Sequence, residues 1–279
     1  MEKREQKELK DVQTLNRLGY DPLRLLGQGA FSRVYLVKRL KTRELFACKI
    51  SEQKNMLFRE GELLAQTDHP LFPKCFNVWQ EQEMGILLME YVCGCNLETL
   101  LDRRGRFSQT QTVRVGVELA EGLRMLHERR EPIFFRDVKP SNIVIRQNGR
   151  AKLLDLGIAC RSGEYGTLAG TPGYAAPEQL TKGGRLTAAC DVYGLGKTLQ
   201  AMAGTDCGRD LMRVIKACTE RQPENRIPDM RGVIEALVSL DGSIGRRERM
   251  RIRRRISQDY LYPDTQCVKS IWESGYKNT

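Results

Sequence analysis

Histidine is rare in this chain, and its cysteines form no framework. His69 and His127 are the two histidines, and of the nine cysteines only Cys93 and Cys95 stand close together. Structural zinc sites need closely spaced pairs of Cys and His ligands, and such pairs are missing here. The sequence therefore predicts no structural metal, and the scattered cysteines favour reduced thiols over disulfide bridges.

Long apolar runs are also missing. No stretch approaches the roughly 20 apolar residues of a membrane-spanning helix, and the first seven residues are too charged to open a signal peptide. With 41% hydrophobic and 29% charged residues, the composition is that of an ordinary globular protein, and we expect a cytoplasmic one. The 279 residues suffice for one large core or two modest ones.

Positive charge is abundant but unevenly distributed. The net charge is +11, and seven of the ten residues in Arg246–Arg255 are arginine. Such a run can bind nucleic acid, an anionic membrane surface or an acidic partner. A solvated basic segment at the end of a domain is an equally good interpretation, and the sequence leaves both open.

The chemistry of the chain is concentrated in one central stretch. Asp137, Lys139 and Asn142 follow one another at short spacing, and Asp155 comes thirteen residues after Asn142. A carboxylate that accepts a hydroxyl proton, a cation that neutralises a moving phosphate and two oxygen ligands for Mg²⁺ are the groups that phosphoryl transfer needs. This stretch resembles the catalytic loop and the metal-binding turn of the protein kinase family.

The resemblance covers roughly residues 20 to 240. Within the family, the chain most resembles the compact eukaryotic-like serine/threonine kinases of bacteria. The resemblance implies an α+β, two-lobed fold with a small antiparallel-sheet N-lobe carrying one helix and a mostly helical C-lobe. The expected organisation is a lead-in helix at 1–19, an N-lobe with its hinge at 20–92, a shortened C-lobe at 93–240 and an Arg-rich tail at 241–279. The lead-in helix is expected from Leu9, Val12, Leu15 and Leu18 at helical spacing.

Two glycines lie between strand-like segments near the start of the resembling region. Gly27 and Gly29 precede Val34 in a strand–loop–strand order, which favours a hairpin lid over phosphates rather than a dinucleotide fold. Glycines let the backbone approach phosphate without a Cβ in the way. The third glycine of the family pattern is replaced by Ser32, which should weaken the lid without abolishing it.

Lys49 lies in the middle of an apolar run, where an unpaired ammonium would be costly. By resemblance it reaches the α- and β-phosphates of ATP, and Val34 and Ala47 line the same nucleotide. The family spacing selects Glu60 as its partner, with Glu62 as the alternative. The helix that carries them is expected to be short and loosened by Gly61.

Further along the chain, Met89, Glu90 and Val92 resemble the linker between the lobes. By that resemblance Met89 lines the back of the adenine pocket, and backbone groups of Glu90 and Val92 bind the adenine edge. An ordinary core strand is the alternative, and side chains alone do not exclude it. Ser108 is expected to cap a long helix that ends near His127.

An activation segment is expected between Asp155 and Glu178. By resemblance Thr171 bonds near Asp137 and Lys139, which points to serine/threonine rather than tyrosine specificity. Thr167 is the best candidate phosphosite of the segment, because a phosphate there could pair with the arginine that precedes Asp137.

Three further residues match structural positions of the family. Asp191 would hold the backbone of the catalytic loop, and Arg226 would pair with Glu178. The interval from Asp191 to Arg226 is shorter than the family usually has, so a substrate-docking helix is expected to be missing. Substrate docking would then depend on the tail or on dimerisation.

The resemblance implies an ATP- and Mg²⁺-dependent serine/threonine protein kinase that phosphorylates protein substrates and is expected to autophosphorylate by the same chemistry. Two rivals remain open at this point. One is a small-molecule kinase on a related fold, against which the activation segment argues. The other is a nucleotide-binding scaffold with a nucleic-acid-binding basic tail.

Overall fold

A computed structural model describes residues 2–164, 168–204 and 207–241 of this chain. The candidate phosphosite Thr167 and the Arg246–Arg255 run lie outside the described residues. Within the described ranges, no helix combines the length and the apolar character that a membrane crossing needs.

The described chain forms two compact units. Of the described residues, the first holds 2–68 and 73–92, and the second holds 69–72 and those between 93 and 241. The sequence analysis assigned residues 69–72 to the N-lobe, but they pack with the second unit. The backbone N–H of Leu153 donates to the carbonyl of Leu71 at 2.8 Å, which ties this segment to the second unit.

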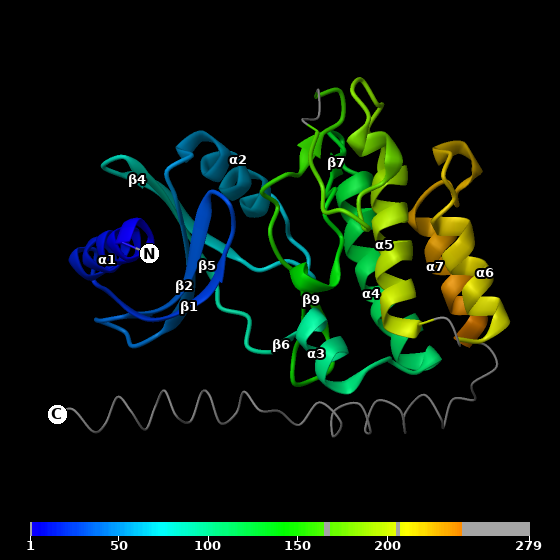
Figure 1. Ribbon diagram of the computed structural model, residues 1–279, viewed down its shortest axis with the longest axis horizontal. Helices are drawn as coiled ribbons and strands as arrows, with labels where there is room; N and C mark the ends of the chain where they lie inside the picture. The colour runs from blue at the N-terminus through cyan, green and yellow to red at the C-terminus, as the bar shows by residue number, and fades with distance from the viewer. Residues whose placement is uncertain (1, 165–167, 205–206, 242–279) are drawn as a thin grey trace. The chain divides into compact units, whose positions relative to one another are not determined.

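The first unit is built on one antiparallel sheet of five strands in the order β1-β2-β3-β5-β4 (Figure 1). Alternating apolar residues fit such a sheet because successive side chains point to opposite faces. In this sheet Val34 lies opposite Lys49, and Lys49 lies opposite Leu87, so these three side chains share one face. The strands are β1 (Tyr20–Gln28), β2 (Ser32–Arg39), β3 (Leu45–Ser51), β4 (Cys75–Glu81) and β5 (Met84–Glu90).

Two helices complete the first unit. Helix α2 (Lys54–Ala65) has 12 residues, so the prediction that this helix is short is wrong. Helix α1 (Glu2–Arg17) is present where a lead-in helix was expected, but its buried face differs from the predicted stripe. Leu9 is 59% exposed, whereas Leu15 is fully buried in the core of the sheet. Helix α1 therefore packs against the sheet and contributes to the core of the first unit.

The second unit is mostly helical. Ser108 caps α4 as expected. Its side chain accepts from the backbone N–H of Gln111 at 3.3 Å, and the side-chain oxygen of Gln111 accepts from the backbone N–H of Ser108 at 2.9 Å. Helices α4 and α5 pack closely, since a Cβ on Gly116 would lie 2.7 Å from the side chain of Leu199. The helices are α3 (Leu97–Arg104), α4 (Gln109–His127), α5 (Ala188–Ala203), α6 (Arg209–Cys218) and α7 (Met230–Asp241).

Short elements carry the functional loops of the second unit. Two small sheets, of order β6-β8-β9 and β10-β7, flank the catalytic stretch. The short strands are β6 (Cys95–Asn96), β7 (Ile133–Phe134), β8 (Ile143–Ile145), β9 (Ala151–Leu153) and β10 (Cys160–Arg161). The 3₁₀ helices are η1 (Pro140–Asn142), η2 (Pro177–Leu180) and η3 (Pro223–Asn225). Between α5 and Arg226, the described residues contain α6 and η3 only, as the shortened interval predicted.

Candidate active site

The glycine-rich hairpin of the first unit joins β1 to β2. Gly27 lies opposite Val34, and the backbone N–H of Gly29 donates to the carbonyl of Ser32 at 2.8 Å. A Cβ on Gly27 would meet nothing within 4 Å, and one on Gly29 would meet only Ser32, at ordinary contact distance. The chain itself does not require glycine at these positions. A ligand that approaches the backbone, such as a phosphate, would require it.

Lys49 and Glu60 form a buried ion pair in the first unit. The ammonium lies 2.8 Å from each carboxylate oxygen, and the two residues are 6% and 4% exposed. The alternative partner, Glu62, is exposed. Gly61 brings α2 close to the sheet, because a Cβ there would lie 2.9 Å from the Cβ of Val78. This glycine therefore tightens the packing of α2, where the sequence analysis expected it to loosen the helix.

The residues expected to contact adenine lie at the end of β5 and just beyond it. Met89 lies opposite Ala47 in the sheet, so both side chains share a face. The backbone N–H of Glu90 donates to the carbonyl of Lys74 at 2.8 Å, so this N–H is taken up within the sheet. Val92 is the last of the first unit's described residues. Their contacts with a nucleotide stay a prediction.

Asp137 is the centre of a polar cluster in the second unit. Its Oδ1 accepts from the hydroxyl of Thr171 at 2.8 Å, and its Oδ2 accepts from the Nδ2 of Asn142 at 2.9 Å. The ammonium of Lys139 lies 2.8 Å from Oδ2 and also donates to the hydroxyl of Thr171 at 2.6 Å. Three residues that the sequence singled out therefore meet at the carboxylate of a fourth, Asp137, whose side chain is 14% exposed.

Asn142 and Asp155 supply the oxygen atoms that fit Mg²⁺. The Nδ2 of Asn142 donates to both the carbonyl and the carboxylate of Asp137, which leaves Oδ1 as a ligand. The backbone N–H of Leu154 donates to the carbonyl of Asn142 at 2.7 Å, so Asp155 follows a strand that is tied to the catalytic loop. Asp155 is exposed and takes a positive φ of 71°. Its carboxylate accepts a hydrogen bond from the backbone N–H of Gly157 at 3.0 Å.

Mg²⁺ is commonly held by one or two carboxylates together with the phosphates of its substrate. This donor set fits that pattern, with Asp155 as the exposed carboxylate and Asn142 as the neutral oxygen. No group of three or more His, Cys, Asp or Glu side chains suited to a metal occurs among the described residues. A site that relies on substrate phosphates does not need one.

The catalytic loop is held from below by Asp191, which is fully buried on α5. Its carboxylate accepts from the backbone N–H groups of Phe135 and Arg136 at 2.8 and 2.6 Å. It also lies 2.7 Å from the Nε2 of His127, a contact that the sequence analysis missed. A histidine at a helix end carries no signal of a distant partner, so only the fold could reveal it.

Arg136 is buried beside the metal-binding turn. Its guanidinium donates to the carbonyl of Ile158 at 3.1 Å, and its own carbonyl accepts from the side chain of Gln179 at 2.9 Å. Its backbone φ is 71°, a region that non-glycine residues rarely adopt. The tertiary bonds on both sides of the residue hold this conformation. Its expected contact with a phosphorylated Thr167 lies outside the described residues.

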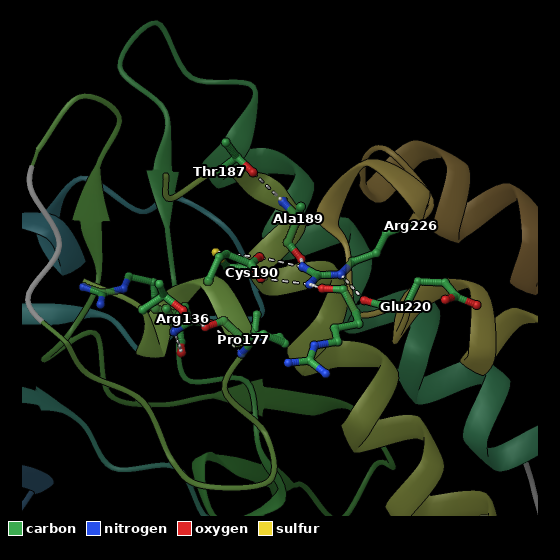
Figure 2. A network of polar contacts seen from close by, with 12 residues as sticks. Arg136, Pro177, Thr187, Ala189, Cys190, Glu220 and Arg226 are labelled. Carbon is green, nitrogen blue, oxygen red and sulfur yellow. Dashed lines mark hydrogen bonds and ion pairs between the residues drawn. The ribbon is translucent and has the colours of Figure 1, made fainter. Parts of the chain in front are cut away.

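Arg226, labelled in Figure 2, forms another buried ion pair with Glu178. The two distances are 2.6 and 2.9 Å, and the remaining guanidinium N–H groups donate to the carbonyls of Ala189, Glu220 and Arg221. Burial acts to raise the pKa of Glu178, but the hydrogen bonds and charge of Arg226, a backbone hydrogen bond and the Cys190 thiol together outweigh it, and the pKa lies below its ordinary value of 4.5. This pair fixes η2 to the segment before α7.

A cavity of about 600 Å³ also lies in the second unit, away from the catalytic loop. Residues of α4, the β8–β9 turn and the 69–72 segment line it, and none of the predicted site residues is among them. The cavity therefore plays no part in the assignment of the active site.

Comparisons with known proteins agree with this geometry. The family model of the protein kinase domain matches residues 20–228. The human cAMP-dependent protein kinase catalytic subunit PRKX is 34% identical over 186 residues, which cover 63% of this chain and 51% of that protein. CBL-interacting protein kinase 12 of rice (Oryza sativa subsp. japonica) is 32% identical over 200 residues, 66% of this chain and 36% of that protein. The chain thus spans about half the length of the human relative.

Proposed function

Because the chain belongs to the protein kinase family, we propose that it transfers the γ-phosphoryl group of ATP to serine and threonine hydroxyls of proteins. The contact between Thr171 and Asp137 carries this proposal. A threonine hydroxyl already donates to Oδ1 of Asp137 at 2.8 Å, so this carboxylate is placed to accept a proton from an aliphatic hydroxyl.

The roles of the second-unit residues follow from their contacts. Asp137 orients the acceptor hydroxyl and takes its proton. Lys139, 2.8 Å from that carboxylate, neutralises charge that develops on the transferred group. Asn142 keeps Asp137 in place through two hydrogen bonds, at 3.0 and 2.9 Å. When bound through Asn142 and Asp155, Mg²⁺ would supply charge neutralisation at the ATP phosphates.

The roles of the first-unit residues concern ATP. Lys49, held by Glu60, would bind its α- and β-phosphates, and the Gly27–Gly29 hairpin would cover them with backbone N–H groups. Val34, Ala47 and Met89 would contact the nucleotide from β2, β3 and β5. Backbone groups of Glu90 and Val92 would bind the adenine edge.

Three finer assignments belong to this proposal. The bond from Lys139 to the Thr171 hydroxyl supports serine/threonine specificity. The brief passage from α5 to Arg226 supports a compact kinase of the bacterial type. Autophosphorylation, with Thr167 as its target, follows from the position of that residue in the activation segment.

The decisive experiment is the intact mass of the full chain after incubation with Mg·ATP and a mixture of Ser/Thr-containing peptides. Wild type should add phosphate to itself or to peptides, whereas Asp137→Asn and Lys49→Met should add none. Peptide mapping would then test Thr167. Wild-type protein that binds Mg·ATP but phosphorylates no protein would favour a small-molecule kinase or a scaffold.

A partner for the Arg246–Arg255 run rests on charge alone. Binding of a nucleic acid, an anionic vesicle or an acidic protein should weaken steeply as salt is raised, and deletion of the run should abolish it. Affinity that is independent of salt would contradict this part of the proposal. Sedimentation of the wild type and of the deletion variant would test whether the chain forms the dimer that was suggested in place of the missing substrate-docking helix.

A further inference from the structure

The two faces of the first-unit sheet carry different helices. Lys49 points to the face covered by α2, which supplies Glu60. The opposite face is covered by α1, whose Leu15 is fully buried. Leu15 packs in a cluster with residues of β2, β3 and β5: Tyr35, Val37, Phe46, Cys48, Ile50, Met84, Ile86 and Leu88. Helix α1 is therefore part of the core of this unit.

One polar contact interrupts this apolar face. Asp11 of α1 is 0% exposed and forms a bidentate pair with Arg33, whose Nε and Nη2 both donate to it, the latter at 3.0 Å. The hydroxyl of Tyr35 donates to the same carboxylate at 2.9 Å. Burial first, and then the hydrogen bond to Asp11, raise the pKa of Tyr35, so its hydroxyl stays a donor at neutral pH.

This contact lies at the base of the glycine-rich hairpin. Arg33 is the second residue of β2 and lies opposite Gln28 of β1 and Ile50 of β3, so it stands where β2 leaves the hairpin. Ser51 gives the hairpin a second attachment, because its hydroxyl donates to the carbonyl of Phe31 at 2.7 Å. The hairpin is thus fixed from α1 on one side and from the end of β3 on the other.

A buried ion pair costs desolvation and often contributes less stability than apolar residues of the same volume would. Apolar packing around Leu15 already attaches α1 to the sheet, so the pair is not needed for attachment. What a bidentate pair adds is a fixed direction, since a guanidinium and a carboxylate meet in one plane. Because Arg33 belongs to β2, the pair with Asp11 fixes the direction in which β2 leaves the glycine-rich hairpin.

We propose that Asp11 is a positioning residue for ATP, which holds the glycine-rich hairpin in its phosphate-binding position through Arg33 and Tyr35. The inference rests on the proposed function, because it assumes that the hairpin covers the phosphates of ATP. Helix α1 then sets the affinity for ATP without touching the nucleotide.

The test compares nucleotide binding by full-length variants in isothermal titration. Asp11→Asn removes the charge at nearly constant shape, and Tyr35→Phe removes one hydrogen bond only. Arg17→Ala is the matched control, because it removes the exposed pair between Arg17 of α1 and Glu81 of β4 at the same helix–sheet junction. Each protein is titrated with Mg·ATP and, separately, with adenosine.

Asp11→Asn should weaken Mg·ATP binding roughly tenfold, because a misplaced phosphate cradle loses contacts steeply with distance. Tyr35→Phe should weaken it about threefold. Adenosine, which has no phosphates, should bind each variant within about twofold of wild type, and the Arg17→Ala control should match wild type for both ligands. A purely structural role would lower the fraction of binding-competent molecules and leave the Kd for ATP unchanged.

An ATP Kd that stays at the wild-type value in the folded fraction of both variants would overturn the inference. Equal losses for ATP and adenosine would overturn it as well, because the phosphate-covering hairpin would not be the affected part. If Asp11→Asn does not fold, Tyr35→Phe decides alone. Wild-type protein that binds no Mg·ATP would overturn the proposed function together with this inference, whereas normal wild-type binding with unaffected variants would overturn this inference only.

Discussion

The second unit contains two polar clusters of opposite character, one around Arg226 and one around Asp137. The side chain of Arg226 is 0% exposed, and all five of its N–H groups have an acceptor. Asp137 is partly exposed, and its partners are an amide, an ammonium and a hydroxyl at the ends of three separate side chains. In the Arg226 cluster every N–H group is hydrogen-bonded, and the cluster joins separate chain segments. In the Asp137 cluster, a substrate hydroxyl can replace one of the hydrogen bonds to the carboxylate.

This difference separates stability from chemistry. A saturated buried network loses much free energy when one partner is removed, since the other is left buried and unpaired. A partly exposed cluster can give up one hydrogen bond to a ligand at small cost. Substitutions in the two clusters should therefore affect different measurements.

The largest expected effect is on catalysis. Asp137→Asn should reduce phosphoryl transfer by about 10³-fold, because the amide cannot accept the hydroxyl proton. The free energy of unfolding should change by less than about 1 kcal/mol, since Asn keeps the shape of the side chain. Single-turnover transfer and thermal unfolding check the two halves. Loss of transfer with a matching loss of stability would mean that the Asp137 cluster is structural too.

The next effect is on stability. Arg226→Ala should lower the free energy of unfolding by about 3–5 kcal/mol, because Glu178 would be left without its partner in a largely buried position. Chemical denaturation measures this change. The control is Arg231→Ala, which removes the exposed Arg231–Glu128 pair and should cost less than about 1 kcal/mol. Equal costs for the two variants would contradict the contrast between saturated and exposed pairs.

A smaller effect is expected at the edge of the catalytic cluster. Thr171→Val should reduce transfer about tenfold, because Asp137 and Lys139 each lose one hydrogen bond from a side chain of nearly the same shape. Thr171→Ser keeps the hydroxyl and should stay within about twofold of wild type. Initial rates at saturating ATP distinguish the two. A Ser variant as slow as the Val variant would assign the effect to packing of the methyl group.

The smallest effect concerns pH. The pKa of Glu178 is lowered in the folded protein, so its stabilising contribution is fully present above the unfolded value of 4.5 and is lost as the pH falls through the folded value. The Tm of wild type should therefore fall more steeply than that of Glu178→Gln as the pH drops below about 4.5. Parallel pH profiles would show that the ion pair is not linked to protonation in this range.

Much of this molecule could be predicted from local pattern. Ser108 and Gln111 form the cap of α4, three positions apart. The groups of the catalytic stretch lie within six positions of the chain, from Asp137 to Asn142. The cap could be predicted because its residues lie at fixed helical spacing. The choice of Glu60 over Glu62 as the partner of Lys49 came instead from the resemblance to the family, and the structure confirms that pair.

The errors share a different cause. The predicted apolar stripe of α1 included Leu9, which is exposed, and left out the buried Asp11, because a charged residue normally marks a solvated face. Its partner is 22 positions away. Residues 69–72 were assigned to the wrong unit because nothing local indicates that they pack against β9. Gly61 was taken as a weak point of α2, although it fits the helix against Val78.

The sequence by itself determined the family, the order of its parts and the kinds of atoms that phosphoryl transfer uses. Only the tertiary structure decided which atoms meet. It brought His127 to Asp191 across 64 positions and Asp11 to Arg33 on the face opposite Lys49. The physical reason is that a buried polar group must find a partner wherever the fold supplies one. No local pattern in a single sequence records that distant choice.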